Sequence, residues 1–259
     1  MTMLCDPAYV VPPPPPAGPV GTLTWLRATV SRFSAGADHA RRRALILERL
    51  AAIEPAWLSE RARETGDHVV ALAEALGASD AAAAAAAVAE IAPHYNPAPG
   101  GDRPGKPAEP PAAGVLADPQ GTAADAQGTS ADPQGMAADA HGMAADAHGT
   151  AADATAAGPP AAGAPDAAVA ALLTLLPPAE PERVAQDIAI LVQACAATAA
   201  LIANGGALDP PPVPATRRIA PDGSVVTVDL APHPFGAGPR ACPGAEHALA
   251  LAQGVLESR

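Results

Sequence analysis

The chain has 259 residues, of which 32 are proline and 23 glycine, and only 2% are aromatic. That length is enough for one sizeable domain together with non-globular segments, and the core has to be built from aliphatic side chains. The formal net charge of −12 argues against nucleic acid as the main partner, because phosphate binding needs clustered lysine and arginine. One short basic cluster, Arg41 to Arg43, is too small for such a surface but is suited to a small acidic ligand.

Cysteine usage and hydropathy bear on the compartment. The three cysteines, Cys5, Cys195 and Cys242, are too few and too scattered for a disulfide framework, and they favour a reducing compartment. The first residues show no basic segment followed by an apolar run, so no signal peptide is expected. No stretch reads as long and apolar enough to cross a bilayer. We therefore expect a soluble, cytoplasmic protein with no membrane and no nucleic-acid partner.

The first part of the chain divides into a lead-in and a helical part. Residues 1–20 contain a proline tract and are expected to form an extended, polyproline-type lead-in. Residues 21–96 are expected to form an N-terminal helical part. The spacing of apolar residues and the capping signals there predict helices over 22–35, from an N-cap at Asp38 to Pro55, over 57–76 and over 81–91.

Residues 97–165 have a different character. Aspartate recurs every seven residues from Asp118 to Asp153. A seven-residue period is typical of a coiled coil, but every full unit carries a glycine and none has a pair of large apolar residues for a seam. We therefore interpret the segment as a disordered acidic linker. His141 and His148 lie within it, and metal binding by them is not expected because no second liganding pair accompanies them.

Residues 166–259 are expected to form a C-terminal part. An apolar helix is predicted over 167–176 and a long amphipathic helix over 181–203. Two short β-branched runs flank a Pro-Asp-Gly turn and predict a hairpin, and a final helix is predicted over 245–256. The fold class is therefore mainly α, with a small β-hairpin and a long disordered linker.

The strongest candidate site surrounds Cys242. Three glycines lie close to it in the sequence, and glycine allows a backbone to turn tightly and to approach a flat ligand. A helix that starts just after Cys242, together with the positive charge of Arg240, favours a thiolate with a lowered pKa. Such a cysteine is suited to be a metal ligand or, with a base, a nucleophile. His247 is the nearest base in the sequence, but nothing in the sequence fixes its position.

The segment from Phe235 to Gly244 reads Phe-Gly-Ala-Gly-Pro-Arg-Ala-Cys-Pro-Gly. It resembles the haem-binding loop of the cytochrome P-450 family, the haem-thiolate monooxygenases, and every fixed position of that signature is present. The resemblance implies haem b as cofactor, with Cys242 as the ligand of its iron and Arg240 as a partner of a haem propionate. It also implies haem-binding roles for Phe235, Gly238 and Gly244. Thiolate ligation pushes electron density onto iron and favours O–O cleavage.

Two other segments are similar to the same family. His39 and Arg43, one helical turn apart, resemble the pair that faces the haem propionates. The helix over 181–203 resembles the helix that crosses the distal face of the haem, and its Thr198 aligns with the family's catalytic threonine. Ala197 stands where the family has an acid. A solvated basic helix end and a plain amphipathic core helix are the alternatives for these two segments.

The departures from the family concern length and connection. A complete family domain is considerably longer than this chain, and the resemblance covers about two thirds of it, in pieces. Only residues 204–209 lie where two helices should follow the distal helix, so the Glu-x-x-Arg pair that holds the family's fold together is missing there. We therefore expect an abbreviated cytochrome P-450-like helical fold.

The expected function is that of a monooxygenase acting on a small-molecule substrate with O₂. Its electrons would come from a separate, ferredoxin-type donor, because no flavin or nicotinamide fingerprint is visible in the sequence. The alternative is a degenerate, non-catalytic haem-binding or interaction protein derived from such an enzyme. A cysteine-dependent hydrolase is a third interpretation, with less support.

Overall fold

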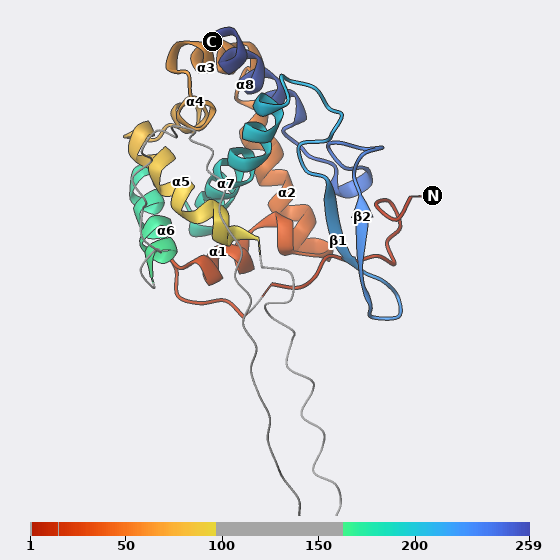
Figure 1. The fold of residues 1–259 in the computed structure, drawn as a ribbon. Coiled ribbons are helices and arrows are strands. Elements are labelled where there is room, and N and C mark those ends of the chain that lie inside the picture. The colour runs from red at the N-terminus through yellow and green to blue at the C-terminus, as the bar shows by residue number, and fades with distance from the viewer. Residues whose placement is uncertain (1, 15, 97–162) are drawn as a thin grey trace, which may run out of the picture. The chain divides into compact units, whose positions relative to one another are not determined.

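The computed structural model describes residues 2–14, 16–96 and 163–259. The acidic repeat, with His141 and His148, lies outside these residues. Within them the chain forms eight α-helices, two 3-10 turns and one two-stranded antiparallel sheet (Figure 1). The predicted fold class, mainly α with a small β-hairpin, is confirmed at this level.

The N-terminal part contains five helices, and two expectations about them were wrong. Asp38 does not cap its helix, which begins earlier in the sequence and places Asp38 in its first turn. The single helix expected over 57–76 is divided, because Gly66 adopts a left-handed φ of 68° and Asp67 caps a new helix by accepting the Val69 amide at 2.7 Å. The helices are α1 (Leu23–Thr29), α2 (Gly36–Ala51), α3 (Pro55–Thr65), α4 (His68–Ala75) and α5 (Ala81–Tyr95), with a 3-10 turn at Ser31–Phe33.

The C-terminal part follows the expected order closely. The hairpin pairs Ala215 with Asp229 and Ile219 with Val225, around the predicted turn. One helix begins slightly inside the segment that was assigned to the linker. The elements are α6 (Ala164–Leu175), α7 (Pro181–Ala203), β1 (Ala215–Ile219), β2 (Val225–Asp229), a 3-10 turn at Gly238–Arg240, and α8 (Ala245–Glu257).

Helix α7 is the centre of the helical core. It packs against α1, α2, α4, α5, α6 and α8, and both Ile188 and Leu191 are fully buried on it. By length and apolar composition alone α7 would suffice to cross a membrane, contrary to the sequence expectation. Of its most apolar stretch, 61% is buried among the other helices, which accounts for that composition as core packing.

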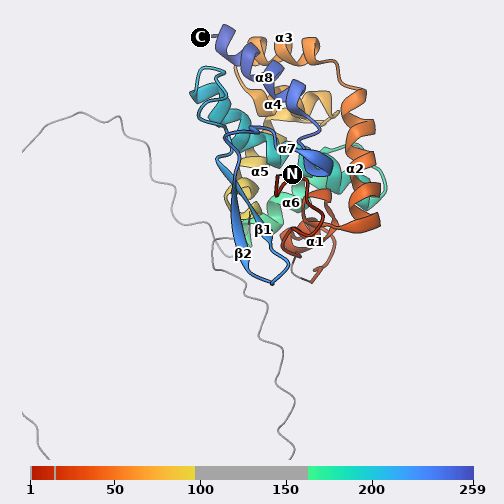
Figure 2. The ribbon, with the colours of Figure 1, turned by 90° about the vertical axis from the view of Figure 1, so that its right-hand side faces the viewer.

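The proline-rich lead-in is more than an extended tail. Val10 forms an antiparallel bridge with Ile219 of β1, and Leu4 is buried against Val228 and Leu230. Figures 1 and 2 show the N-terminal segment lying beside the hairpin. The lead-in therefore packs as an additional strap on the sheet, which the sequence pattern did not predict.

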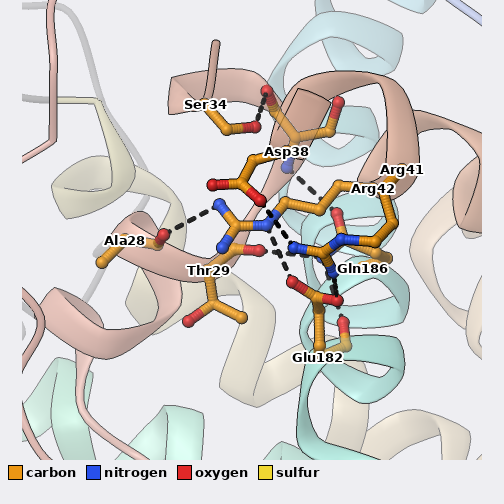
Figure 3. Close-up of polar contacts among 9 residues, drawn as sticks. Ala28, Thr29, Ser34, Asp38, Arg41, Arg42, Glu182 and Gln186 are labelled. Atoms are coloured by element: carbon orange, nitrogen blue, oxygen red, sulfur yellow. Dashed lines mark hydrogen bonds and ion pairs between the residues drawn. The ribbon is translucent and has the colours of Figure 1, made fainter. Parts of the chain in front are cut away.

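Helix α2 is fastened to the start of α7 by charged side chains (Figure 3). Arg41 and Arg42 both pair with Glu182 of α7, and Arg42 also donates to the carbonyl oxygen of Ala28 at 2.9 Å. Arg41 additionally pairs with Asp38 at 2.8 Å. These two arginines are therefore paired with carboxylates of the chain itself, so the Arg41–Arg43 cluster is not available as a whole for an acidic ligand.

Further contacts between α2 and α7 lie toward the C-terminal end of α2. The Arg49 side chain lies 3.2 Å from the carboxylate of Asp187, and Arg183 lies 3.0 Å from Glu48. The buried Gln186 joins the same region to the preceding turn, because its Oε1 accepts the Ser31 amide at 3.0 Å. These contacts therefore extend over about two turns of α2, from Arg41 to Arg49, and involve residues 182–187 of α7.

We predict that Glu182→Gln lowers the free energy of unfolding by about 1–2 kcal/mol, because a half-buried arginine loses its carboxylate partner. Arg42 supports this expectation, since its side chain is only 13% exposed and burial lowers its pKa. The matched control is Glu48→Gln, whose partner Arg183 is exposed and whose loss should have a clearly smaller effect on the free energy of unfolding. Urea unfolding gives the free energy of unfolding of both variants. Equal losses would show that the ion pairs of Glu182 stabilise the contact between α2 and α7 no more than the exposed pair does.

Candidate functional site

The loop around Cys242 is closed by its own backbone. The Cys242 amide donates to the Phe235 carbonyl oxygen at 2.7 Å. Gly236 and Gly238 have φ values of 73° and 66°, in the left-handed region where a side chain is strained. Gly244 has an ordinary φ of −107°, and a Cβ there would meet only the side chain of Leu50 at 3.5 Å. Two of the signature glycines are thus required by the backbone, and the third is not.

The loop rests on α2 and the turn that precedes it. Arg43 of α2 donates to the carbonyl oxygen of Ala241 at 2.7 Å. Arg240 donates in the opposite direction, to the carbonyl oxygen of Ser34 at 2.6 Å. Two of the predicted propionate partners therefore lie at the loop, and both hold it at the residues just before Cys242.

Four arginines and one histidine gather beside the loop from four separate elements. Burial lowers the pKa of His39, and the charges of Arg240 and Arg43 lower it further. Burial also lowers the pKa of Arg240, with added effects of Arg218 and Arg43. The buried Arg218 of β1 has its pKa lowered by burial and then by Arg32. We call Arg32, His39, Arg43, Arg218 and Arg240 the cationic cluster.

The cationic cluster lacks internal neutralisation. Among the residues that the structure describes, none of its five members forms an ion pair with a carboxylate, and the neighbouring charges that lower the pKa values of His39, Arg218 and Arg240 are positive. Partly desolvated arginines that repel one another are unfavourable unless an anion joins them. The cluster is therefore a candidate site for an anionic group, and the structure brings together His39, Arg43 and Arg240, the three propionate partners expected from the sequence.

Two members of the cationic cluster were missed from the sequence. Arg218 lies on β1, and the predicted hairpin already contained the signal, since residues alternate between faces of a strand. Arg32 lies in a 3-10 turn, and its place beside the loop follows only from the packing of segments far apart in the chain. No local pattern marks Arg32 as a site residue.

The predicted low pKa of Cys242 is wrong for the free chain. The residue is accessible to solvent, yet the surrounding protein desolvates the thiol enough to raise its pKa. A hydrogen bond from the Gly244 amide and the charges of Arg43 and Arg32 oppose this change without overcoming it. Cys242 is therefore a protonated thiol at neutral pH, which suits a ligand that loses its proton on metal binding better than a free nucleophile.

The distal residue Thr198 is not joined to the cationic cluster by any contact found among the described residues. Its side chain is fully buried in α7 and its hydroxyl has no hydrogen-bond partner there. The ion pairs between α2 and α7 involve residues 182–187, about three turns before Thr198. The catalytic role of Thr198 stays a prediction.

Two shallow cavities are the best defined in the described part of the chain. One, of 320 Å³, lies between residues 205–206 and α8, and the other, of 370 Å³, lies between the start of α3 and α8. Neither is lined by Cys242 or by the cationic cluster. A ligand at Cys242 therefore binds to the accessible face of the loop or requires the neighbouring segments to separate.

The donor set at Cys242 limits the kind of metal that fits. The described residues contain no group of three or more histidine, cysteine, aspartate and glutamate side chains that would hold an ion by themselves. An ion at Cys242 must therefore bring most of its ligands with it, as iron in a porphyrin does. Porphyrin propionates are also anions of the kind that the cationic cluster lacks.

Comparisons of the chain with family models, with curated proteins and with solved structures gave no match. The family relationship implied by the loop from Phe235 to Gly244 therefore stays a hypothesis. What the structure contributes is the placement of the loop, the cationic cluster and α2 beside one another.

We predict that the free chain loses stability on acidification because of His39. Its pKa in the folded chain lies below the unfolded value of about 6.5, so between these values the unfolded chain binds more protons. The free energy of unfolding should therefore fall as the pH drops through 6.5 toward the folded pKa. His39→Gln should flatten this dependence between about pH 7.5 and 5.5. An unchanged slope in urea unfolding would contradict the desolvated position of His39.

Proposed function

We propose that the chain is a haem-thiolate protein that binds haem b through Cys242 and acts as a monooxygenase-type oxidoreductase. The single observation that carries the proposal is the unneutralised cationic cluster beside an accessible cysteine. Haem b presents two carboxylates and one metal ion in a single ligand. The signature loop from Phe235 to Gly244 supports the choice of haem over other anionic ligands.

Each part of the site has a role in holding this ligand. Cys242 is the iron ligand, and its proton leaves when the metal binds. His39, Arg43 and Arg240 hold the propionates, with Arg218 adding positive charge beside Arg240. The propionate charges also favour protonation of His39, which the free chain disfavours. Gly236 and Gly238 keep the loop backbone in the conformation that brings these groups together.

Bound haem supplies oxygen activation, which thiolate ligation favours by donating electron density to the iron. The chain then supplies the binding groups and the surroundings of a small-molecule substrate. Electrons come from a ferredoxin-type donor in the cytoplasm, since the sequence contains no fingerprint for a flavin or nicotinamide of its own. The abbreviated cytochrome P-450-like fold is part of the same proposal.

A second candidate function is a non-catalytic haem-binding or interaction protein. The observation that favours it is the distal side, where Thr198 is buried with an unpartnered hydroxyl and Ala197 replaces the acid. The two candidates share the cysteine and the cationic cluster. They differ only in whether the distal side of the haem binds oxygen and delivers protons to it.

We predict that Cys242→Ser abolishes the thiolate-type spectrum of the haem-reconstituted, reduced protein under carbon monoxide. Cys5→Ser and Cys195→Ser should leave that spectrum unchanged, because neither thiol belongs to the loop. An unchanged Soret band in Cys242→Ser would overturn the proposed function.

The same haem titration tests the cationic cluster with a matched pair of arginines. Arg43→Gln should weaken haem binding by about tenfold, the equivalent of one charged hydrogen bond of about 1.4 kcal/mol. Arg41→Gln, two positions away but paired with Asp38 and Glu182, should leave haem affinity within about twofold. Equal effects of the two substitutions would show that affinity follows net charge and not the cluster.

We predict slow and poorly coupled turnover by the wild-type chain with a surrogate ferredoxin system. A positioned proton donor contributes on the order of 10²–10⁴ in rate, and Ala197 cannot serve as one. Ala197→Asp should raise the product formed per electron consumed. The measurement is this coupling ratio for both chains, with hydrogen peroxide as the competing product. No turnover in either haem-bound chain would favour the non-catalytic candidate, and efficient coupling in the wild type would show another proton route.

A further inference from the structure

His247 occupies a specific place between α8 and α2. Its Nε2 lies 3.1 Å from the carbonyl oxygen of Leu50 and 3.0 Å from that of Ile53. Carbonyl oxygens only accept hydrogen bonds, so Nε2 carries the proton and donates to both. The other ring nitrogen, Nδ1, is buried without a partner among the described residues. The ring is therefore held in one tautomer and one orientation.

The acceptors of His247 belong to the end of α2. The last carbonyl groups of a helix have no partner within the helix and carry a partial negative charge. Leu50 lies in the last turn of α2, which ends at Ala51, and its carbonyl oxygen also accepts the Ile53 amide at 3.0 Å. Ile53 lies just beyond Ala52, the C-cap of α2. His247 thus supplies a side-chain donor to a helix terminus, from the first turn of α8.

Three contacts place α2 alongside the segment that contains Cys242. Arg43 donates to Ala241 before the cysteine. The side chain of Leu50 reaches within 3.5 Å of where a Cβ of Gly244 would lie, just after the cysteine. His247 then binds the end of α2. Cys242 lies between the first and second of these contacts, so the segment is attached to α2 on both sides of the thiol.

We propose that His247 is a positioning residue, which holds Cys242 in register with Arg43 by anchoring the first turn of α8 to the end of α2. The role as iron ligand that this positioning serves rests on the proposed function, whereas the anchoring is a property of the free chain. Nothing points to His247 as a base for Cys242. Its Nε2 proton is committed to carbonyl groups, and the groups that change the pKa of Cys242 do not include it.

The test uses the haem-free chain with Cys5 and Cys195 replaced by serine, so that Cys242 is the only thiol. His247→Leu removes the donor, and His247→Gln keeps an N–H donor at a similar reach. The measurement is the rate of reaction with a neutral aromatic disulfide at pH 7.5. Release of the anchor should let the loop around Cys242 move away from α2, which opens the thiol to the reagent and raises the rate.

The expected result is a several-fold faster reaction at pH 7.5 for His247→Leu and a rate within about twofold of the parent for His247→Gln. A second chain that keeps only Cys195, in α7, controls for general loosening, and its rate should not change with His247→Leu. Three results would each overturn the proposal. They are an unchanged reaction rate of Cys242 in His247→Leu, equal rates for the two His247 variants, and an equal acceleration of the Cys195 reaction.

Haem titration separates this inference from the proposed function. If the wild type binds haem with a thiolate spectrum, His247→Leu should reduce that spectral component and His247→Gln should retain it. Absence of haem binding by the wild type would overturn the proposed function alone, because the thiol rates decide the role of His247 without haem. Retention of the full thiolate component by His247→Leu would overturn the positioning role.

Discussion

The ion pairs between α2 and the start of α7 determine which side of α2 is left for the cysteine loop. Each residue turns a helix by about 100°, so neighbouring arginines cannot all face the same partner. Arg41 and Arg42 are drawn to Glu182, and Arg43 consequently points to Ala241 of the loop. A run of three arginines that looks uniform in the sequence therefore has two functions in the structure. Two fasten helices together, and the third belongs to the cationic cluster.

Local patterns made much of this site predictable, and distant packing made the rest unpredictable. The loop could be predicted because its residues are contiguous in the sequence. Gly236 and Gly238 also mark it, since the left-handed backbone at these two positions favours glycine. The break at Gly66 also has local signals, a glycine C-cap followed by the N-cap Asp67, which the sequence interpretation did not use. Arg32 and Arg218 reach the site only through the packing of a turn and a strand far apart in the chain. The docking of the lead-in on β1 depends on the same kind of long-range contact.

The pKa of Cys242 shows why counting nearby charges was insufficient. The sequence showed the favourable influences, a helix start and a nearby arginine, but not the amount of protein around the thiol. Desolvation penalises a charged form from every direction, whereas each opposing interaction acts through one contact. In the structure the first effect outweighs the Gly244 amide and the charges of Arg43 and Arg32. The free chain therefore combines a protonated thiol with cations that repel one another.

These two unfavourable features point to the same kind of ligand. An anion relieves the repulsion within the cationic cluster, and a metal ion replaces the thiol proton. The site that would hold such a ligand is built from α2, the 3-10 turn at Ser31–Phe33, the hairpin and the loop. Thr198 and Ala197 lie about three turns along α7 from the residues that pair with α2. In the proposed function, binding of haem and turnover therefore depend on different parts of the chain, so a substitution at Ala197 can change turnover while the groups around Cys242 are unaffected.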